Sequence, residues 1–277
     1  MINKEKFATK ADLFKFLKDN KDKIIAQKKY EMKRADAISY QVLSFLEKAE
    51  KDERAIKAAD DIDALLAKDK ITVRSIINTT NLLDSHSDVH IKGIWKKSLK
   101  EQKNLYLLQE HQMKFDHIIS DNVNASAKTV TWESLGFNFE GNTEALVFDS
   151  EIEKARNGYM FDQYARGYVK NHSVGMRYVQ LHLCVDSTDK YYIEEKENWD
   201  KYIGEVANRD EAEEKGYFWA VTEAKVVEGS AVPVGSNWAT PTQSVKEISE
   251  PPSGTCDDIE PPSGTRKGIF NSIINFN

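Results

Sequence analysis

A stretch of short β-patterned segments between residues 71 and 242 is the feature that most constrains the fold of this chain. β-branched and aromatic side chains are frequent in these segments, and apolar and polar positions alternate at residues 71–77 and along the longest segment. The predicted strands span residues 71–77, 129–132, 145–148 and 168–185. Helical spacing interrupts them at residues 93–103 and 152–166. Many short strands mixed with a few helices predict an α+β fold, with a closed or half-closed β-barrel core and helices outside it.

The residues before this body have a different pattern. Residues 1–70 contain neither proline nor glycine, and their apolar residues recur at helical spacing, which predicts two or three amphipathic helices. Thr9 followed by Asp12 suits a helix N-terminus, because the hydroxyl and the carboxylate can each accept an unpaired backbone N–H. These helices form either a subdomain that packs on the body or an arm that binds a partner or a second copy.

The residues after the body repeat a short polar sequence. Glu-Pro-Pro-Ser-Gly-Thr occurs at residues 250–255 and again at residues 260–265, and this composition cannot build a core. We therefore predict three parts. They are a helical N-terminal region at residues 1–70, a core domain at residues 71–242 and a flexible Pro/Gly/Ser tail at residues 243–277.

The composition argues against several classes of protein. The formal net charge of −6, from 39 basic and 45 acidic residues, opposes binding to the phosphate backbone of nucleic acid. No apolar run approaches the roughly 20 residues of a membrane-spanning helix, so we expect no membrane partner and a cytoplasmic location. Cys184 and Cys256 are too few for a disulfide scaffold, and we interpret both as free thiols.

Six histidines lie between residues 86 and 182, and imidazole is the side chain best suited to proton transfer near neutral pH. His86 and His90 have the i, i+4 spacing of a zinc pair that His111 and His117 would complete, but Ser87 follows His86 where such a pair has a glutamate. We therefore predict no metal site. His111 ends an apolar, strand-like run at a polar boundary, where a general base or an ordinary, partly buried histidine would both fit.

Ser173 begins the long alternating strand, with Gly175 two residues further on. A nucleophile needs an exposed oxygen on a rigid support, and a nearby glycine lets a substrate backbone approach. A structural serine at a strand end is equally compatible with this position. Glu223 and Glu228 flank a later strand, and either could orient a histidine or lie as a solvated charge at the strand edge.

Four blocks of sequence, in order, resemble the tailed-phage prohead maturation protease family. Residues 81–99 are similar to its entry segment, and residues 107–111 to the strand that ends in its catalytic histidine. Residues 168–176 resemble its Ser-Ile-Gly-aromatic nucleophile motif, with Val174 and Met176 in place of the isoleucine and the aromatic residue. Residues 219–233 resemble its late strand with Glu-x-Ser-x-Val, and residues 186–215 look like an acidic insertion at the surface.

This resemblance implies a serine endopeptidase with a fold like that of herpesvirus assemblin, a β-barrel surrounded by helices. His111 would be the general base, Ser173 the nucleophile and Glu228 the group that orients the histidine, with Glu223 as the second choice. Arg177 is a weaker candidate for stabilising the oxyanion. No cofactor is implied.

The partners implied are the phage major capsid protein and the scaffold protein as substrates, with self-association and self-cleavage in addition. Cleavage after Glu250 or Glu260 would remove parts of the tail. The location would be the host cytoplasm, inside the immature capsid. The alternative is a catalytically inactive scaffold or minor capsid protein of the same fold.

Overall fold

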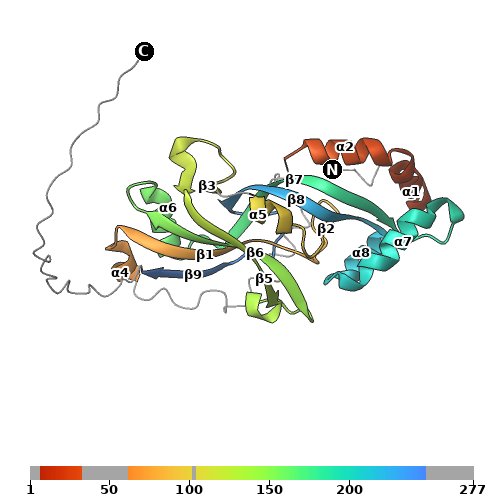
Figure 1. Cartoon of the computed structure of the whole chain (residues 1–277). Coiled ribbons are helices and arrows are strands. Elements are labelled where there is room, and N and C mark those ends of the chain that lie inside the picture. The colour runs from red at the N-terminus through yellow and green to blue at the C-terminus, as the bar shows by residue number, and fades with distance from the viewer. Residues whose placement is uncertain (1–6, 33–61, 102–103, 248–277) are drawn as a thin grey trace, which may run out of the picture.

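The computed structural model describes residues 7–32, 62–101 and 104–247, and its strands form two sheets (Figure 1). The first sheet is antiparallel and has the strand order β5-β6-β1-β9. Its members are β1 (Lys70–Thr79), β5 (Asn122–Thr131), β6 (Asn142–Glu153) and β9 (Thr242–Glu247). β1 and β6 are largely buried because they lie in the middle of the sheet, whereas β5 forms an exposed edge.

The second sheet is built around one long strand, β8 (Tyr217–Val232). β7 (Asn171–Val185) runs antiparallel along one edge of β8. β2 (Asp88–His90) and β3 (Leu107–Gln109) pair in parallel with successive parts of the other edge, and β4 (Ile118–Ser120) pairs with β3. The β7–β8 register shifts at three places, which allows this long pair to bend.

The predicted mixture of strands and helices is confirmed, but the predicted β-barrel core is not. The two sheets meet near Ser120, whose Oγ donates to the carbonyl of Glu151 at 2.6 Å, and at a single bridge between Asn171 and Pro241. Next to that bridge, the His172 N–H donates to the Thr240 carbonyl at 3.1 Å and the Thr240 hydroxyl donates to the His172 carbonyl at 2.7 Å, so a few contacts join the two sheets at this corner. Beyond these contacts, the described strands form two separate sheets without continuous pairing between them.

Seven α-helices occur in the described ranges. They are α1 (Lys10–Asp19), α2 (Lys21–Tyr30), α4 (Ile62–Leu66), α5 (Lys96–Glu101), α6 (Gly158–Ala165), α7 (Ile193–Tyr202) and α8 (Arg209–Lys215). Short 3₁₀ segments lie at Phe115–His117, Glu133–Leu135, Lys190–Tyr192 and Ile203–Glu205. In Figure 1, α1, α2, α7 and α8 gather at one end of the molecule.

The N-terminal helices pack on the body of the protein. The predicted cap is present, since Thr9 Oγ1 accepts the Asp12 N–H and Asp12 Oδ2 accepts the Thr9 N–H, each at 3.1 Å. Leu17 of α1 is fully buried in the main core, and Lys18 pairs with the buried Glu195 of α7 at 2.5 Å. Of the two alternatives for this region, a packed subdomain or a binding arm, α1 and α2 therefore match the packed subdomain. Residues 33–61 of the predicted helical region lie outside the described residues. Residues 243–247 of the predicted tail form part of β9, and the rest of the tail, residues 248–277, lies outside the described residues.

The predicted surface insertion at residues 186–215 is a packed part of the fold. It forms α7 and α8, and the ring of Trp199 lies 5.2 Å from that of Phe218 on β8. Trp199 is 3% exposed, so this segment contributes to a second, smaller hydrophobic core rather than forming a loose excursion. The domain limits at residues 70 and 242 stay a prediction.

The main core fills the space between the two sheets. Val174 and Met176 of β7 are buried there together with residues of β1 and β6. A Cβ added to Gly229 would lie 2.6 Å from the Phe148 ring, so glycine at this position lets β8 approach β6 closely. This close approach fixes one face of β8 against the core and leaves its opposite face to carry other side chains.

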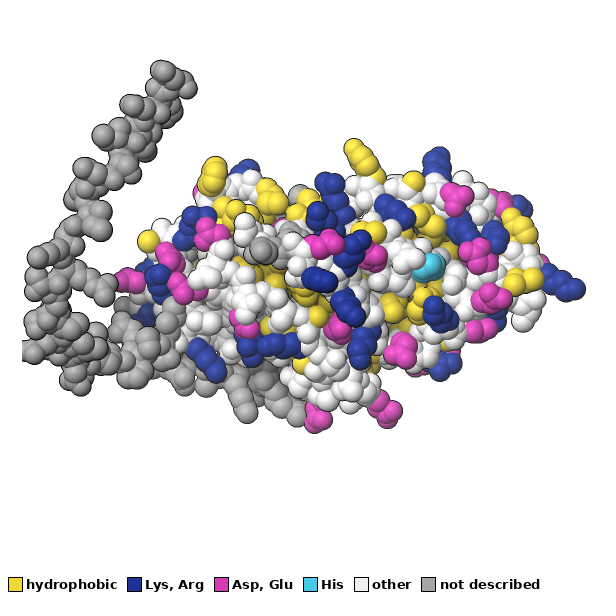
Figure 2. Space-filling view, viewed as in Figure 1, with side chains coloured by type: hydrophobic (Ala, Val, Ile, Leu, Met, Phe, Trp, Pro, Cys, Tyr) yellow, Lys and Arg dark blue, Asp and Glu magenta, His cyan; other side chains and the backbone are white. Residues whose placement is uncertain are grey.

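On the face shown in Figure 2, basic and acidic side chains lie interspersed between small apolar areas. Within the described ranges, no helix is both long and apolar enough to cross a membrane.

Candidate active site

His111 lies in a tight turn directly after β3. Glu110 and His111 both have left-handed backbone conformations, with φ values of 50° and 58°. Such conformations are costly for residues other than glycine and persist where neighbouring contacts hold them. Here the Glu110 N–H donates to the Ala231 carbonyl at 3.0 Å, and the His111 N–H donates to Ser230 Oγ at 3.1 Å. Two residues of β8 therefore hold the turn that presents the imidazole.

The His111 ring bonds to a buried carboxylate. Nδ1 of His111 lies 2.6 Å from Oε1 of Glu228, and the two side chains are 6% and 1% exposed. Because a carboxylate accepts hydrogen bonds, Nδ1 carries a proton, and in the neutral ring Nε2 is the basic nitrogen. This is the arrangement by which an acidic side chain fixes the tautomer and the orientation of a catalytic histidine.

Ser230 is hydrogen bonded to the other oxygen of that carboxylate. Its Oγ donates to Glu228 Oε2 at 2.6 Å, so both carboxylate oxygens are hydrogen bonded. Ser230 is fully buried. The hydrogen bonds recorded in this site therefore form a connected set through His111, Glu228 and Ser230.

Ser173 enters the site through the β7–β8 register. It lies directly opposite Ser230, and Gly175 lies opposite Glu228. Side chains of directly opposed residues lie on the same face of an antiparallel pair, with Cβ atoms about 4.5–5.5 Å apart. The Ser173 side chain therefore points to the same face as Glu228 and Ser230, next to their hydrogen bonds, and Ser173 is 5% exposed.

Gly175 confirms the direction of this face. A Cβ added to Gly175 would lie 1.9 Å from Oε1 of Glu228, the oxygen that bonds His111. The carboxylate therefore fills the space that any larger residue at position 175 would need. The sequence had suggested a different reason for this glycine, namely room for a substrate backbone.

Two other predicted residues lie away from this cluster. Glu223, the second choice for orienting His111, pairs with Lys97 of α5 at 3.3 Å and lies five residues along β8 from Glu228, roughly 16 Å in an extended strand. Arg177 is exposed and lies opposite Lys225, four residues and roughly 13 Å along β7 from Ser173. Neither residue belongs to the hydrogen-bonded cluster around His111.

The histidines considered for zinc are dispersed. His90 is buried on β2 and bonds Asn78 at 3.2 Å and Tyr178 at 3.0 Å, while His117 bonds Asp116 at 2.9 Å. His86 lies 3.9 Å from Asp84. Among the described residues, no group of three or more His, Cys, Asp and Glu side chains is arranged to hold a metal ion.

A second buried polar network lies further along β7. The Tyr178 hydroxyl donates to Asp88 Oδ2 at 2.9 Å, and the ammonium group of Lys28 on α2 pairs with Asp88 Oδ1. Burial lowers the pKa of His90 and raises the pKa of Tyr178 well above its ordinary value. Both groups therefore stay neutral near pH 7, and the network ties α2 to the second sheet.

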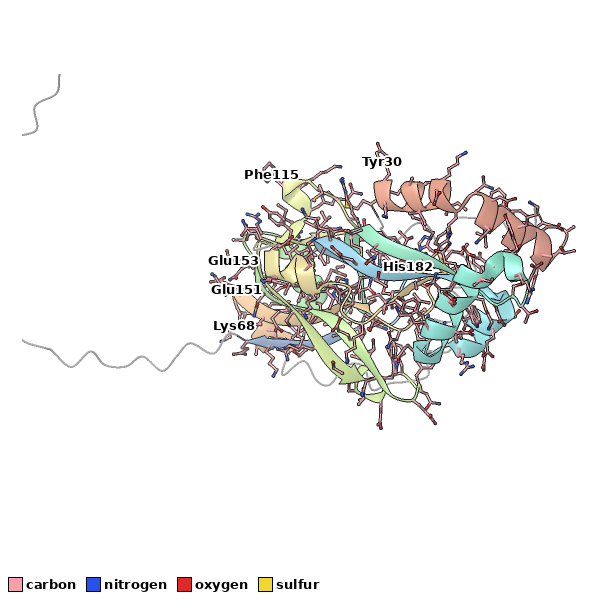
Figure 3. The ribbon with its side chains drawn as sticks, turned by 45° about the vertical axis from the view of Figure 1, so that its right-hand side comes forward. Tyr30, Lys68, Phe115, Glu151, Glu153 and His182 are labelled. Atoms are coloured by element: carbon pink, nitrogen blue, oxygen red, sulfur yellow. The ribbon has the colours of Figure 1, made fainter. Side chains whose placement is uncertain are left out.

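The turn after His111 continues into an exposed segment with two apolar side chains, Met113 and Phe115. Phe115 is 90% exposed and projects from the turn, whereas Tyr30, 87% exposed, lies at the end of α2 (Figure 3). The segment is anchored to α6, because Asn157 Nδ2 donates to the Asp116 carbonyl at 3.3 Å. The surface beside His111 thus offers an apolar side chain on a fixed turn.

Sequence reasoning included Ser230 only as the serine of the Glu-x-Ser-x-Val motif and gave it no role, and it missed the contact between Gly175 and Glu228. The spacing of Glu228 and Ser230 carried a signal, because residues i and i+2 of a strand point to the same face. The pairing of β7 with β8 leaves no signal that can be recognised in a single sequence.

No family model, no curated protein and no solved structure matches this chain.

Proposed function

We propose that the chain is a serine endopeptidase in which Ser173, His111 and Glu228 form the catalytic set. The observation that carries the proposal is the 2.6 Å contact between His111 Nδ1 and Glu228 Oε1, in a buried cluster beside which Ser173 lies. A histidine oriented by a carboxylate, with a serine on the adjoining strand, is the constellation that acyl transfer requires.

The reaction follows from the roles of these groups. His111 Nε2 takes the proton of the Ser173 hydroxyl while Oγ attacks the carbonyl carbon of the scissile peptide bond. Glu228 stabilises the imidazolium that forms, and the imidazolium then gives its proton to the leaving amine. Water hydrolyses the resulting ester by the same steps in reverse, and the free Ser173 hydroxyl is restored. General-base assistance of this kind contributes about 10²- to 10⁴-fold in rate.

The biological role that we propose is maturation of a phage capsid. The substrates would be the scaffold protein and the scaffolding segment of the major capsid protein, with the chain's own termini in addition, cleaved inside the prohead. The motif order quoted above supports this assignment, as does the match of His111, Ser173 and Glu228 to their motif positions. In this proposal the two sheets correspond to a half-closed barrel of the assemblin type.

Coexpression with the capsid and scaffold proteins tests the proposal. The wild-type chain should shorten these proteins on a gel, and Ser173→Ala should leave them at full length. Ser134→Ala provides the matched control, because Ser134 is exposed in the 3₁₀ turn at Glu133–Leu135. Unchanged processing by Ser173→Ala would remove Ser173 from the nucleophile role, and no processing by the wild type would favour the inactive scaffold protein.

A further inference from the structure

Ser230 connects two parts of the candidate active site that lie far apart in the sequence. Its Oγ accepts the backbone N–H of His111 at 3.1 Å and donates its proton to Glu228 Oε2 at 2.6 Å. A serine hydroxyl has a single proton, and here the carboxylate takes it. One hydroxyl therefore determines both where the His111 backbone lies and how the Glu228 carboxylate is turned.

The carboxylate needs this second contact because its terminal torsion is soft. Rotation of a glutamate carboxyl group about χ3 has broad minima, so one hydrogen bond to His111 leaves the plane of the group poorly fixed. With Oε1 bonded to His111 and Oε2 bonded to Ser230, the plane is defined by two partners. In the same way, the left-handed backbone of His111 is held at its N–H by Ser230.

Ser230 is unsuited to be the nucleophile itself. It is fully buried, and its proton is directed at a carboxylate rather than at an imidazole nitrogen. Ser173, directly opposite on β7, lies beside the same cluster and keeps 5% of its surface exposed. The two serines of this cross-strand pair thus have different roles.

We propose that Ser230 is a positioning residue, which holds the His111–Glu228 pair in the geometry that activates Ser173. This inference rests on the proposed function. It predicts that removal of the Ser230 hydroxyl lowers kcat about 10- to 100-fold with little change in KM, the range seen for residues that orient metal ligands in the same indirect way. It also predicts that removal of the Ser230 hydroxyl changes the environment of the proton between His111 and Glu228.

The test compares Ser230→Thr with Ser230→Val, because threonine and valine have the same shape and differ in the hydroxyl. Both variants carry the extra methyl group, so any cost of that group is the same in each. If Ser230→Val fails to fold, Ser230→Ala and the wild type provide the second comparison between a side chain without the hydroxyl and one with it. Two quantities are measured: kcat and KM on a peptide substrate, and the downfield ¹H NMR resonance of the His111 Nδ1 proton, assigned by its absence in Glu228→Gln.

The expected result is that Ser230→Thr keeps the resonance and most of kcat, whereas the variants without the hydroxyl lose or shift the resonance and lose kcat. Equal resonances and equal kcat in the threonine and valine variants, and in Ser230→Ala and wild type, would overturn the positioning role. The resonance is independent of turnover, so this outcome differs from failure of the proposed function, in which Ser173→Ala would process substrates as the wild type does.

Discussion

A Cβ atom at position 175 would lie 1.9 Å from the Glu228 oxygen that bonds His111, so Gly175 and Glu228 share one space across the β7–β8 pair. Cδ and Cγ of Glu228 would lie 2.7 and 2.9 Å from the same Cβ, so the whole outer part of this side chain would have to move, whereas no backbone atom is among the three nearest atoms. Glycine at this position therefore protects the orientation of a carboxylate more than it protects the fold.

Gly175→Ala should consequently abolish most activity while the protein stays folded. The added methyl group would turn the Glu228 carboxylate away from Nδ1 of His111. We expect a loss of at least about 10²-fold in kcat, the contribution of a general base. Thermal unfolding and peptide hydrolysis should be measured together. Gly204→Ala is the matched control, because a Cβ at Gly204 meets no atom within 4 Å; equal activities of the two variants would contradict this reading.

Glu228→Gln should lower kcat by about 10²- to 10⁴-fold, because an amide cannot stabilise the imidazolium and allows the wrong tautomer of His111. Glu223→Gln is the control from the same strand, since Glu223 pairs with Lys97 at the surface instead. Steady-state kinetics of both variants decide between the two glutamates. A larger loss in Glu223→Gln would reverse the assignment.

How much of this site the sequence predicts differs from residue to residue. His111 follows a recognisable strand pattern, so its position just after a strand was predictable, whereas Glu228, expected to flank a strand, lies inside β8. The roles of Gly175 and Ser230 depend on which residues of β7 and β8 lie opposite each other, and that register passes through three irregularities that alternation alone does not fix.

In the fold, too, local features could be predicted from the sequence and long-range contacts could not. Strand β1 and the cap of α1 were predicted from local patterns, because both depend on neighbours in the sequence. The contacts of Thr240 with His172, which join the two sheets, and the pairing of α1 with the buried Glu195 of α7 are both long-range in the sequence. Such contacts leave no periodic signal in one sequence.

Lys28→Met should destabilise the protein by about 3–5 kcal/mol, the usual effect of leaving one member of a buried ion pair alone. Asp88 is fully buried and Lys28 is 12% exposed at its side chain. Urea denaturation measures the change. Lys15→Met is the control, because Lys15 pairs with Asp19 on the exposed side of α1 and should shift the midpoint little. Similar midpoints for the two variants would show that the Lys28–Asp88 pair does not hold α2.

The stability of the protein should fall in mild acid because His172 is buried without charge. Burial lowers the pKa of His172 to about 4 from its ordinary 6.5. Between about pH 4 and 6.5 the unfolded chain binds this proton more readily than the folded protein does. The contribution of neutral His172 to the free energy of unfolding is therefore complete above about pH 6.5 and is lost as the pH falls toward 4. The loss amounts to about 3 kcal/mol.

The free energy of unfolding, measured against pH, checks this prediction. His172→Gln should be less stable at pH 7 but should show a shallower slope between pH 6.5 and 4, since the titrating group is gone. A slope equal to that of the wild type would assign the acid sensitivity to other groups.

Covalent labelling shows whether Ser173 is the nucleophile that His111 and Glu228 activate. The full-length protein is treated with a fluorophosphonate, digested, and the modified residue is located by mass spectrometry. We expect a label on Ser173 that is lost in His111→Ala and strongly reduced in Glu228→Gln. A label on Ser230 or another serine, or no label on the folded wild-type protein, would contradict it.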